Sequence, residues 1–165
     1  MKLMDLSTSI EMGLASDKPH QAPQINYHTH ADNAEATAKA YGVSVDELPF
    51  GIGWANETVS LHSHSGCHMD APWHYFPTMK EGEPARTIDQ VPLEYCFQDG
   101  VHLDFSRWDP GRIIRTDDLR RALDDMEYAL KPLDIVLLES GAGPHFGKAD
   151  YTEYGAGVSE EATVW

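Results

Sequence analysis

The sequence predicts an α/β fold, in which the strands form a small mixed sheet or barrel-like layer and the helices pack outside it. Three successive patterns indicate this class. Residues 101–105 alternate apolar and polar side chains as a half-buried strand does, residues 116–130 have the spacing of an amphipathic helix, and residues 133–138 are almost entirely apolar. A helix followed by a strand that is buried on both faces is typical of α/β organisation.

The predicted helix at residues 116–130 carries signals at both ends. Thr116 is a favoured N-cap residue, and Asp117 with Asp118 complements the positive N-terminal end of the helix dipole. Pro132 blocks continuation of the helix, because proline has no backbone N–H. The apolar face that we expect to pack inward consists of Leu119, Ala122, Leu123 and Met126.

The N-terminal part is expected to contribute a strand, a loop and a helix. Residues 2–6 are predicted as a first strand, and residues 16–26, which are rich in proline and polar side chains, as a loop. Residues 32–41 are predicted as a helix, because Asp32 suits the cap position and Glu35 follows three residues later. Gly42 is a suitable stop. The small apolar face of this helix suggests a peripheral position, as a flap over a site.

Composition limits the size of the protein and its partners. A chain of 165 residues and 18.4 kDa is expected to form one domain over residues 1–165. The net charge of −15 argues against nucleic acid and anionic membranes as partners. No apolar run has the length of a membrane span, and residues 1–7 lack the apolar core of a signal peptide. Cys67 and Cys96 make no disulfide framework, so a reducing, cytoplasmic location is expected.

Residue types that ligate metals are concentrated in residues 62–74, which hold four of the nine histidines. The preceding residues 58–61 alternate polar and apolar side chains and are predicted as a strand. If this strand continues through His64, that side chain shares a face with His62. Ser65 and Gly66 then permit a turn.

After that turn, His68 and Asp70 lie two residues apart and can face the same side. Imidazole and carboxylate together suit a divalent ion such as zinc, manganese or iron(II). The spacing therefore predicts a metal site made by His64, His68 and Asp70.

A fourth histidine, His74, is expected to act as the general base beside that ion. Pro72 fixes its own backbone angle and biases Ala71 toward an extended conformation, which would aim His74 without a helix. Imidazole suits proton transfer at neutral pH, because its reference pKa is about 6.5.

The pattern His64-x-Gly66-x-His68-x-Asp70-Ala71-Pro72-x-His74 resembles the signature of the metal-dependent cyclase-like hydrolases, which include bacterial kynurenine formamidase and isatin hydrolase. The family usually has threonine where this chain has Cys67. The resemblance implies that His64, His68 and Asp70 bind metal and that His74 is the catalytic acid and base. It also implies one or two zinc or manganese ions, hydrolysis of a carbon–nitrogen bond in a small amide, formamide or lactam, and a homo-oligomer.

Several residues admit a different role. Cys67 between two histidines is a candidate nucleophile or soft ligand, although no separate histidine–acid pair is evident to activate it. His28 with His30, and His102 with Asp104, are conceivable further metal positions. His62 and His64 match the H-x-H of cupins, but the glutamate that cupins need is missing before His74.

The type of substrate and the completeness of the site stay open at the level of sequence. The aromatic residues Trp73, Tyr75 and Phe76 suit a flat aromatic substrate or, equally, a hydrophobic core. Ser159 is predicted to cap a helix that has run barely one turn at Trp165. Family members continue further and supply a histidine and a glutamate for a second metal. We therefore expect a fragment of a longer enzyme or, alternatively, a non-catalytic metal-binding protein that keeps half of the site.

Overall fold

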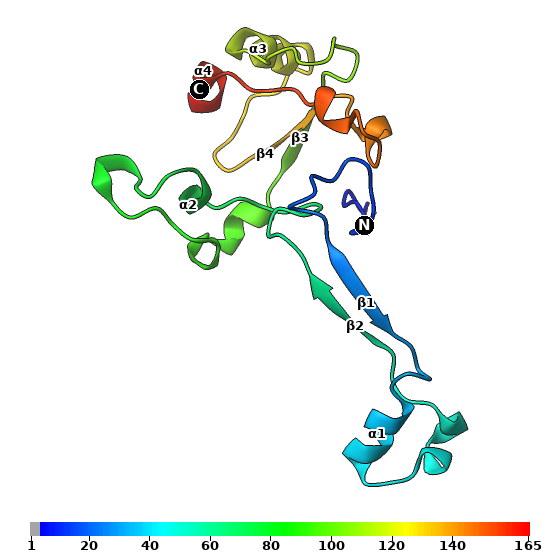
Figure 1. Cartoon of the computed structure of the whole chain (residues 1–165). Coiled ribbons are helices and arrows are strands. Elements are labelled where there is room, and N and C mark those ends of the chain that lie inside the picture. Colours follow the sequence, from blue (N-terminus) through cyan, green and yellow to red (C-terminus); the bar gives the residue numbers. More distant parts are fainter. Residues whose placement is uncertain (1–3) are drawn as a thin grey trace. The chain divides into compact units, whose positions relative to one another are not determined.

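In the computed structural model, which describes residues 4–165, the strands pair as two separate two-stranded sheets (Figure 1). The predicted α/β class is confirmed. In chain order the elements are β1 (Gln24–His28), α1 (Ala34–Tyr41), β2 (Asn56–Ser60), α2 (Pro72–Tyr75), β3 (Gly100–Asp104), α3 (Thr116–Asp125), β4 (Ile135–Glu139) and α4 (Glu160–Val164). Short 3₁₀ turns occur at Val45–Glu47, Pro49–Gly51, Lys80–Gly82, Ile88–Gln90, Leu93–Cys96, Gly143–His145 and Tyr151–Glu153.

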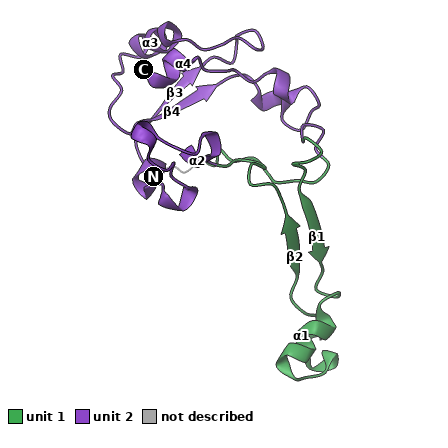
Figure 2. Ribbon diagram, turned by 60° about the vertical axis from the view of Figure 1, so that its left-hand side comes forward, with its two compact units in different colours: residues 1–13, 18–68 green, residues 14–17, 69–165 purple. Residues whose placement is uncertain are grey.

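The described chain divides into two compact units (Figure 2). Unit 1 is Lys18–His68 with the residues up to Gly13, and unit 2 is Met69–Trp165 with Leu14–Asp17. No helix of the part that the structure describes is long and apolar enough to cross a membrane.

Unit 1 contains the antiparallel ribbon of β1 and β2, in which Gln24 pairs with Ser60 and His28 with Asn56. Most side chains of both strands are exposed, so this ribbon has no buried face. Between the strands, residues 29–55 fold back on themselves. The Gly53 N–H donates to the His30 carbonyl at 2.9 Å, and the Asn33 side-chain amide donates to the Trp54 carbonyl at 2.7 Å.

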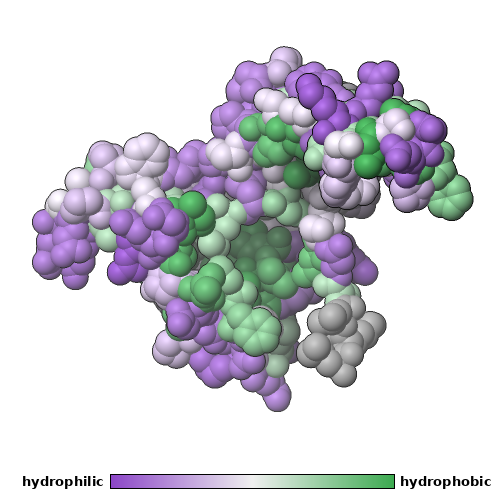
Figure 3. Space-filling view, turned by 90° about the horizontal axis from the view of Figure 1, so that it is seen from below, coloured by the Kyte–Doolittle hydropathy of each residue, from purple (hydrophilic) through white to green (hydrophobic). Residues whose placement is uncertain are grey.

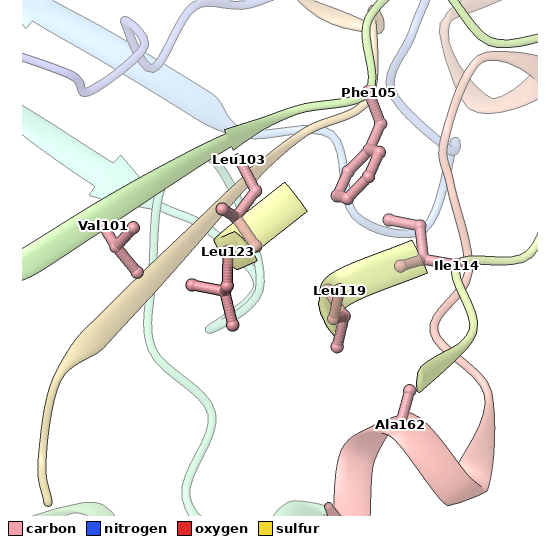
Figure 4. Packing of buried hydrophobic residues seen from close by; sticks show 7 residues of the cluster. All are labelled: Val101, Leu103, Phe105, Ile114, Leu119, Leu123 and Ala162. Atoms are coloured by element: carbon pink, nitrogen blue, oxygen red, sulfur yellow. The ribbon is translucent and has the colours of Figure 1, made fainter. Parts of the chain in front are cut away.

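Unit 2 is organised around a β–α–β connection. β3 and β4 are parallel, with Gly100 opposite Ile135 and Asp104 opposite Glu139, and α3 lies between them in sequence. The alternation in β3 points Val101 and Leu103 toward Leu119 and Leu123 of α3 (Figure 4). The other members of this buried cluster are Phe105, Ile114 and Ala162. Burial of these side chains is the main apolar stabilisation of unit 2.

Local signals located several elements correctly, but two predicted N-caps are wrong, since α1 is preceded by Asn33 and not by Asp32, and α3 by Arg115 and not by Thr116. α1 ends at Gly42, which adopts the left-handed conformation that glycine favours at this position. Ser159 accepts a hydrogen bond from the Ala162 N–H and so caps α4, as predicted. The strand predicted at residues 101–105 is β3, displaced by one residue.

Two predictions near the N-terminus are wrong. The first strand is absent from residues 4–6, and its other residues lie outside the described part of the chain. There Asp5 accepts hydrogen bonds from the N–H and hydroxyl of Ser7, and this local turn competes with an extended strand. The predicted loop at residues 16–26 loses its last three residues to β1, because β2 offers them a partner.

The C-terminal elements need two corrections. The helix predicted to reach residue 130 ends at Asp125, where the N–H groups of Met126 and Tyr128 both donate to the Leu123 carbonyl and close it. β4 was expected to be buried on both faces, but Leu137 is 41% exposed. The buried cluster of unit 2 packs against one face of the sheet formed by β3 and β4, and among the described residues nothing comparable covers the other face.

Large apolar side chains remain exposed in both units. Phe50, Phe97 and Leu93 are exposed to 97%, 92% and 83%, respectively. On the face drawn in Figure 3, apolar residues lie open to solvent beside hydrophilic ones. The small buried cluster in unit 2 therefore accounts for only part of the apolar content of the chain.

Candidate metal centre

A turn, and not a strand, presents His64. β2 ends at Ser60, and the Ser65 N–H donates to the His62 carbonyl at 2.9 Å, which closes a turn over residues 62–65. The predicted continuation of the strand through His64 is therefore wrong. Gly66 follows with φ of +65°, and a β-carbon on it would stand 3.1 Å from Cγ1 of Ile10. The turn-forming residues Ser65 and Gly66 therefore determine the backbone conformation here, and the alternation of side chains seen in β2 does not continue.

His64 and His68 meet across this turn. Nδ1 of His64 lies 3.0 Å from Nε2 of His68, and Nδ1 of His68 lies 2.9 Å from the Gly66 carbonyl oxygen. A carbonyl only accepts hydrogen bonds, so Nδ1 of His68 carries the proton, and the lone pair is on the Nε2 that faces His64. A backbone partner of this kind is typical of histidines that ligate metals.

The separation of these two nitrogens fits one ion. Two nitrogens bound at 2.0–2.1 Å to zinc, with an angle of 90–110° between the bonds, stand about 2.8–3.4 Å apart. The observed 3.0 Å lies within this range. The pair can therefore supply two imidazole ligands to one ion once the ring proton of His64, which Nδ1 donates to His68, has moved to Nε2.

Asp70 and His74 lie on either side of the start of α2. Pro72 occupies the first turn of this helix, and Ala71 before it is extended at φ −84° and ψ 159°, as predicted. The His74 N–H donates to the Ala71 carbonyl at 2.9 Å. His74 is thus oriented by one helical turn, on which the sequence prediction did not rely.

Tyr75, the last residue of α2, contacts both Asp70 and His74. Its hydroxyl donates to Oδ2 of Asp70 at 3.0 Å, and its ring packs edge-on against His74 with centroids 4.9 Å apart. The hydrogen bond to Asp70 raises the pKa of Tyr75, because it stabilises the protonated phenol. Sequence reasoning treated Tyr75 only as an aromatic residue. The signal that it missed is a hydroxyl at the far end of a single turn that starts at proline.

Within the residues from His64 to His74, one ligand atom each of His64, Asp70 and His74 lies within 4.8 Å of the other two. Two imidazoles and a carboxylate are a suitable donor set for zinc, manganese or iron. The structure thus brings His74, the predicted base, as near as a ligand would be. His68, a predicted ligand, is joined to the group through His64.

The other suggested metal positions have no such support. Among residues 4–165, neither the His28 and His30 pair nor the His102 and Asp104 pair belongs to a group of three converging ligand atoms. Nε2 of His102 instead lies 2.9 Å from Oε2 of Glu139 on the neighbouring strand. His102 therefore has a structural partner in the sheet.

Cys67 faces the N-terminal segment of unit 1. Its sulfur lies 3.3 Å from the Thr8 N–H nitrogen and 3.5 Å from the Thr8 hydroxyl. These contacts suit a side chain that accepts a hydrogen bond and fixes the turn.

A second histidine–aspartate contact occurs in residues 140–157. Nδ1 of His145 lies 3.0 Å from Oδ2 of Asp150, and the His145 ring stacks on Tyr154 with centroids 3.5 Å apart. The Ala15 N–H donates to the Gly147 carbonyl at 3.2 Å. This segment, which has no long helix or strand, is thus held by contacts among its own side chains and by one backbone bond from Ala15.

Comparison with known proteins identifies relatives of the whole described chain. The family model described as "Putative cyclase" matches residues 4–165. No curated protein matches the chain. A crystal structure of a novel cyclase matches with a TM-score of 0.67 at 18% identity, over 97% of this chain and 60% of that one. An isatin hydrolase bound to the product analogue thioisatinate matches with a TM-score of 0.62 at 15% identity, over 93% of this chain and 55% of that one. The chain thus spans less than two thirds of the length of either structure, and at these identities the likeness establishes the fold alone.

Proposed function

The chain belongs to the cyclase family, and from this premise we propose that it is a metal-dependent hydrolase of a carbon–nitrogen bond in an amide, formamide or lactam. The observation that carries the proposal is the 3.0 Å approach of the His64 and His68 ring nitrogens, in a stretch that also supplies Asp70 and His74. An isatin hydrolase among the structural neighbours supports the hydrolase class.

In this proposal, His64, His68 and Asp70 hold a divalent ion, zinc or manganese. Such an ion, when bound, polarises the scissile carbonyl and lowers the pKa of a bound water to about 7. His74 accepts a proton from the attacking water at a ring nitrogen and donates it to the departing nitrogen of the substrate. The aromatic rings of Trp73, Tyr75 and Phe76 support a flat substrate, since all three are well exposed and available for contact.

Metal content tests the site directly. Elemental mass spectrometry of the purified protein should find about one ion per chain, and His64→Ala should lose it. His28→Ala is the matched control, because it removes a histidine of β1 that lies outside the motif. Protein without bound metal after exposure to zinc and manganese would contradict the proposal.

Turnover tests the reaction class. The metal-loaded protein should hydrolyse isatin, a lactam, or N-formylkynurenine, a formamide, followed by the change in ultraviolet absorbance. A second candidate function is metal binding without catalysis, since the paired imidazoles of His64 and His68 could hold an ion whether or not a base acts beside them. Tight metal binding together with no turnover of either probe would establish that second function.

A further inference from the structure

We propose that Tyr75 is the positioning residue that orients Asp70 for metal binding. This inference rests on the proposed function and adds a residue to the site. Its observation is the hydrogen bond of 3.0 Å from the Tyr75 hydroxyl to Oδ2 of Asp70. Carboxylates that ligate metals are typically held by hydrogen bonds of this kind from residues behind them.

A phenol is a suitable partner for a metal-binding carboxylate. Lysine or arginine in the same place would neutralise the charge of Asp70, whereas a neutral hydroxyl fixes the carboxylate and leaves its charge available to a cation. The bond occupies one oxygen of Asp70 and fixes the plane of the carboxylate. The other oxygen, Oδ1, is shielded from solvent within the protein.

Two sets of backbone hydrogen bonds hold α2 in place, one within the helix and one to residues 84–86. α2 makes one turn that begins at Pro72, and the Phe76 N–H donates to the Pro72 carbonyl at 3.2 Å. The Trp73 N–H donates to the Arg86 carbonyl at 3.1 Å, and Thr78 bridges to Pro84. These bonds hold the turn, so that the side chain five residues after Asp70 reaches back to it.

The contact is not a by-product of core packing. Tyr75 is 73% exposed, so its ring contributes little buried area. What it does contact are two residues of the proposed site, Asp70 through the hydroxyl and His74 through the ring. The two contacts can be separated experimentally, because phenylalanine keeps the ring and removes only the oxygen.

The test compares the zinc affinity of five proteins, the wild type, three single variants and one double variant, each titrated from the metal-free state with a competing chelator. Tyr75→Phe should weaken zinc binding by about 10- to 100-fold, the loss typical when a partner behind a ligand is removed. Tyr27→Phe is the matched control, because it deletes the same atom from a tyrosine of β1 that is 68% exposed, and it should bind zinc like the wild type. Asp70→Asn supplies the background for a double-mutant cycle.

In the Asp70→Asn background, adding Tyr75→Phe should change affinity by less than about twofold, since Tyr75 acts through Asp70. Equal zinc affinity of the wild type and Tyr75→Phe would overturn the role of Tyr75 and leave the proposed function intact. If Tyr75→Phe weakened zinc binding by the same factor in the Asp70→Asn background as in the wild type, the role of Tyr75 would also be overturned, because Tyr75 would then not act through Asp70. A wild type that binds no metal would overturn both the role of Tyr75 and the proposed function.

Discussion

A β-carbon on Gly53 would stand 2.5 Å from the carbonyl oxygen of Asn33, the residue that precedes α1. The same β-carbon would lie 2.4 Å from Oγ1 of Thr37 within the helix. Real side chains do not approach a backbone oxygen so closely. Gly53 therefore fixes how tightly the chain entering β2 packs against α1.

The substitution Gly53→Ala should destabilise the protein by about 1–3 kcal/mol, because the backbone oxygen must move to admit the methyl group. Urea unfolding measures this. Gly157→Ala is the matched control, because a β-carbon there meets nothing within 4 Å. The control should unfold like the wild type or slightly later. Equal stability of the two variants would contradict the close packing at Gly53.

Replacing His74 by alanine should separate catalysis from metal binding. The rate of hydrolysis should fall by about 10²- to 10⁴-fold, the usual contribution of a general acid and base, while the metal content stays unchanged. His102→Ala is the control, because that histidine is paired with Glu139 in the sheet. Loss of the metal together with activity would make His74 a ligand, and unchanged turnover would remove it from the mechanism.

Cys67→Ser should retain both metal and turnover. The cysteine sulfur accepts from the Thr8 N–H at 3.3 Å, and a serine hydroxyl can accept the same bond. A nucleophilic thiol would instead make this variant inactive. Parallel measurement of turnover and metal content in the variant distinguishes the two roles, and an inactive variant that still binds metal would restore the nucleophile.

Asp134 should make stability depend on pH in the acid range. Its carboxylate accepts from the Lys131 N–H at 2.9 Å and from the Tyr128 hydroxyl at 2.8 Å, and Oδ1 lies 3.2 Å from Nζ of Lys131. The backbone bond from Lys131 is the main cause that lowers the pKa of Asp134 below its ordinary value of 3.8. A lowered pKa stabilises the fold above the ordinary value, and this stability is lost as pH falls through the lower, folded value.

The variant Asp134→Asn should therefore melt below the wild type at pH 7, with a difference that stays constant down to about pH 5 and shrinks below about pH 4. Thermal melts across this range measure it. Asp125→Asn, which removes another carboxylate at the end of α3, is the matched control. A difference that persists unchanged to pH 2 would contradict the role of the charge.

Sequence reasoning was most successful where a signal is local. Gly42 ends α1 and Ser159 caps α4 because these effects depend on a few neighbouring residues. It was less successful where partners distant in sequence decide. Residues 24–26 are a strand because β2 pairs with them.

The same distinction applies to the candidate site. The spacing of His64, His68, Asp70 and His74 is visible in the sequence because all four lie within eleven residues. The way in which they are presented was visible only in part, since the turn at Gly66 and the extended Ala71 were expected, whereas the end of β2 at Ser60 and the helical turn that holds His74 were not. The bond between Tyr75 and Asp70 depends on the rotation of that single turn, which residue types alone do not specify.

Because β3 and β4 run parallel, their ladder forms only after the intervening chain of about 30 residues has closed. Closing a flexible loop of that length costs about 3 kcal/mol of chain entropy before the first bond between the strands is made. The helix α3 needs no such closure, since its hydrogen bonds join residues only four positions apart. We therefore expect α3 to form before the sheet, and closure of this connection, not helix formation, to limit the folding rate of unit 2.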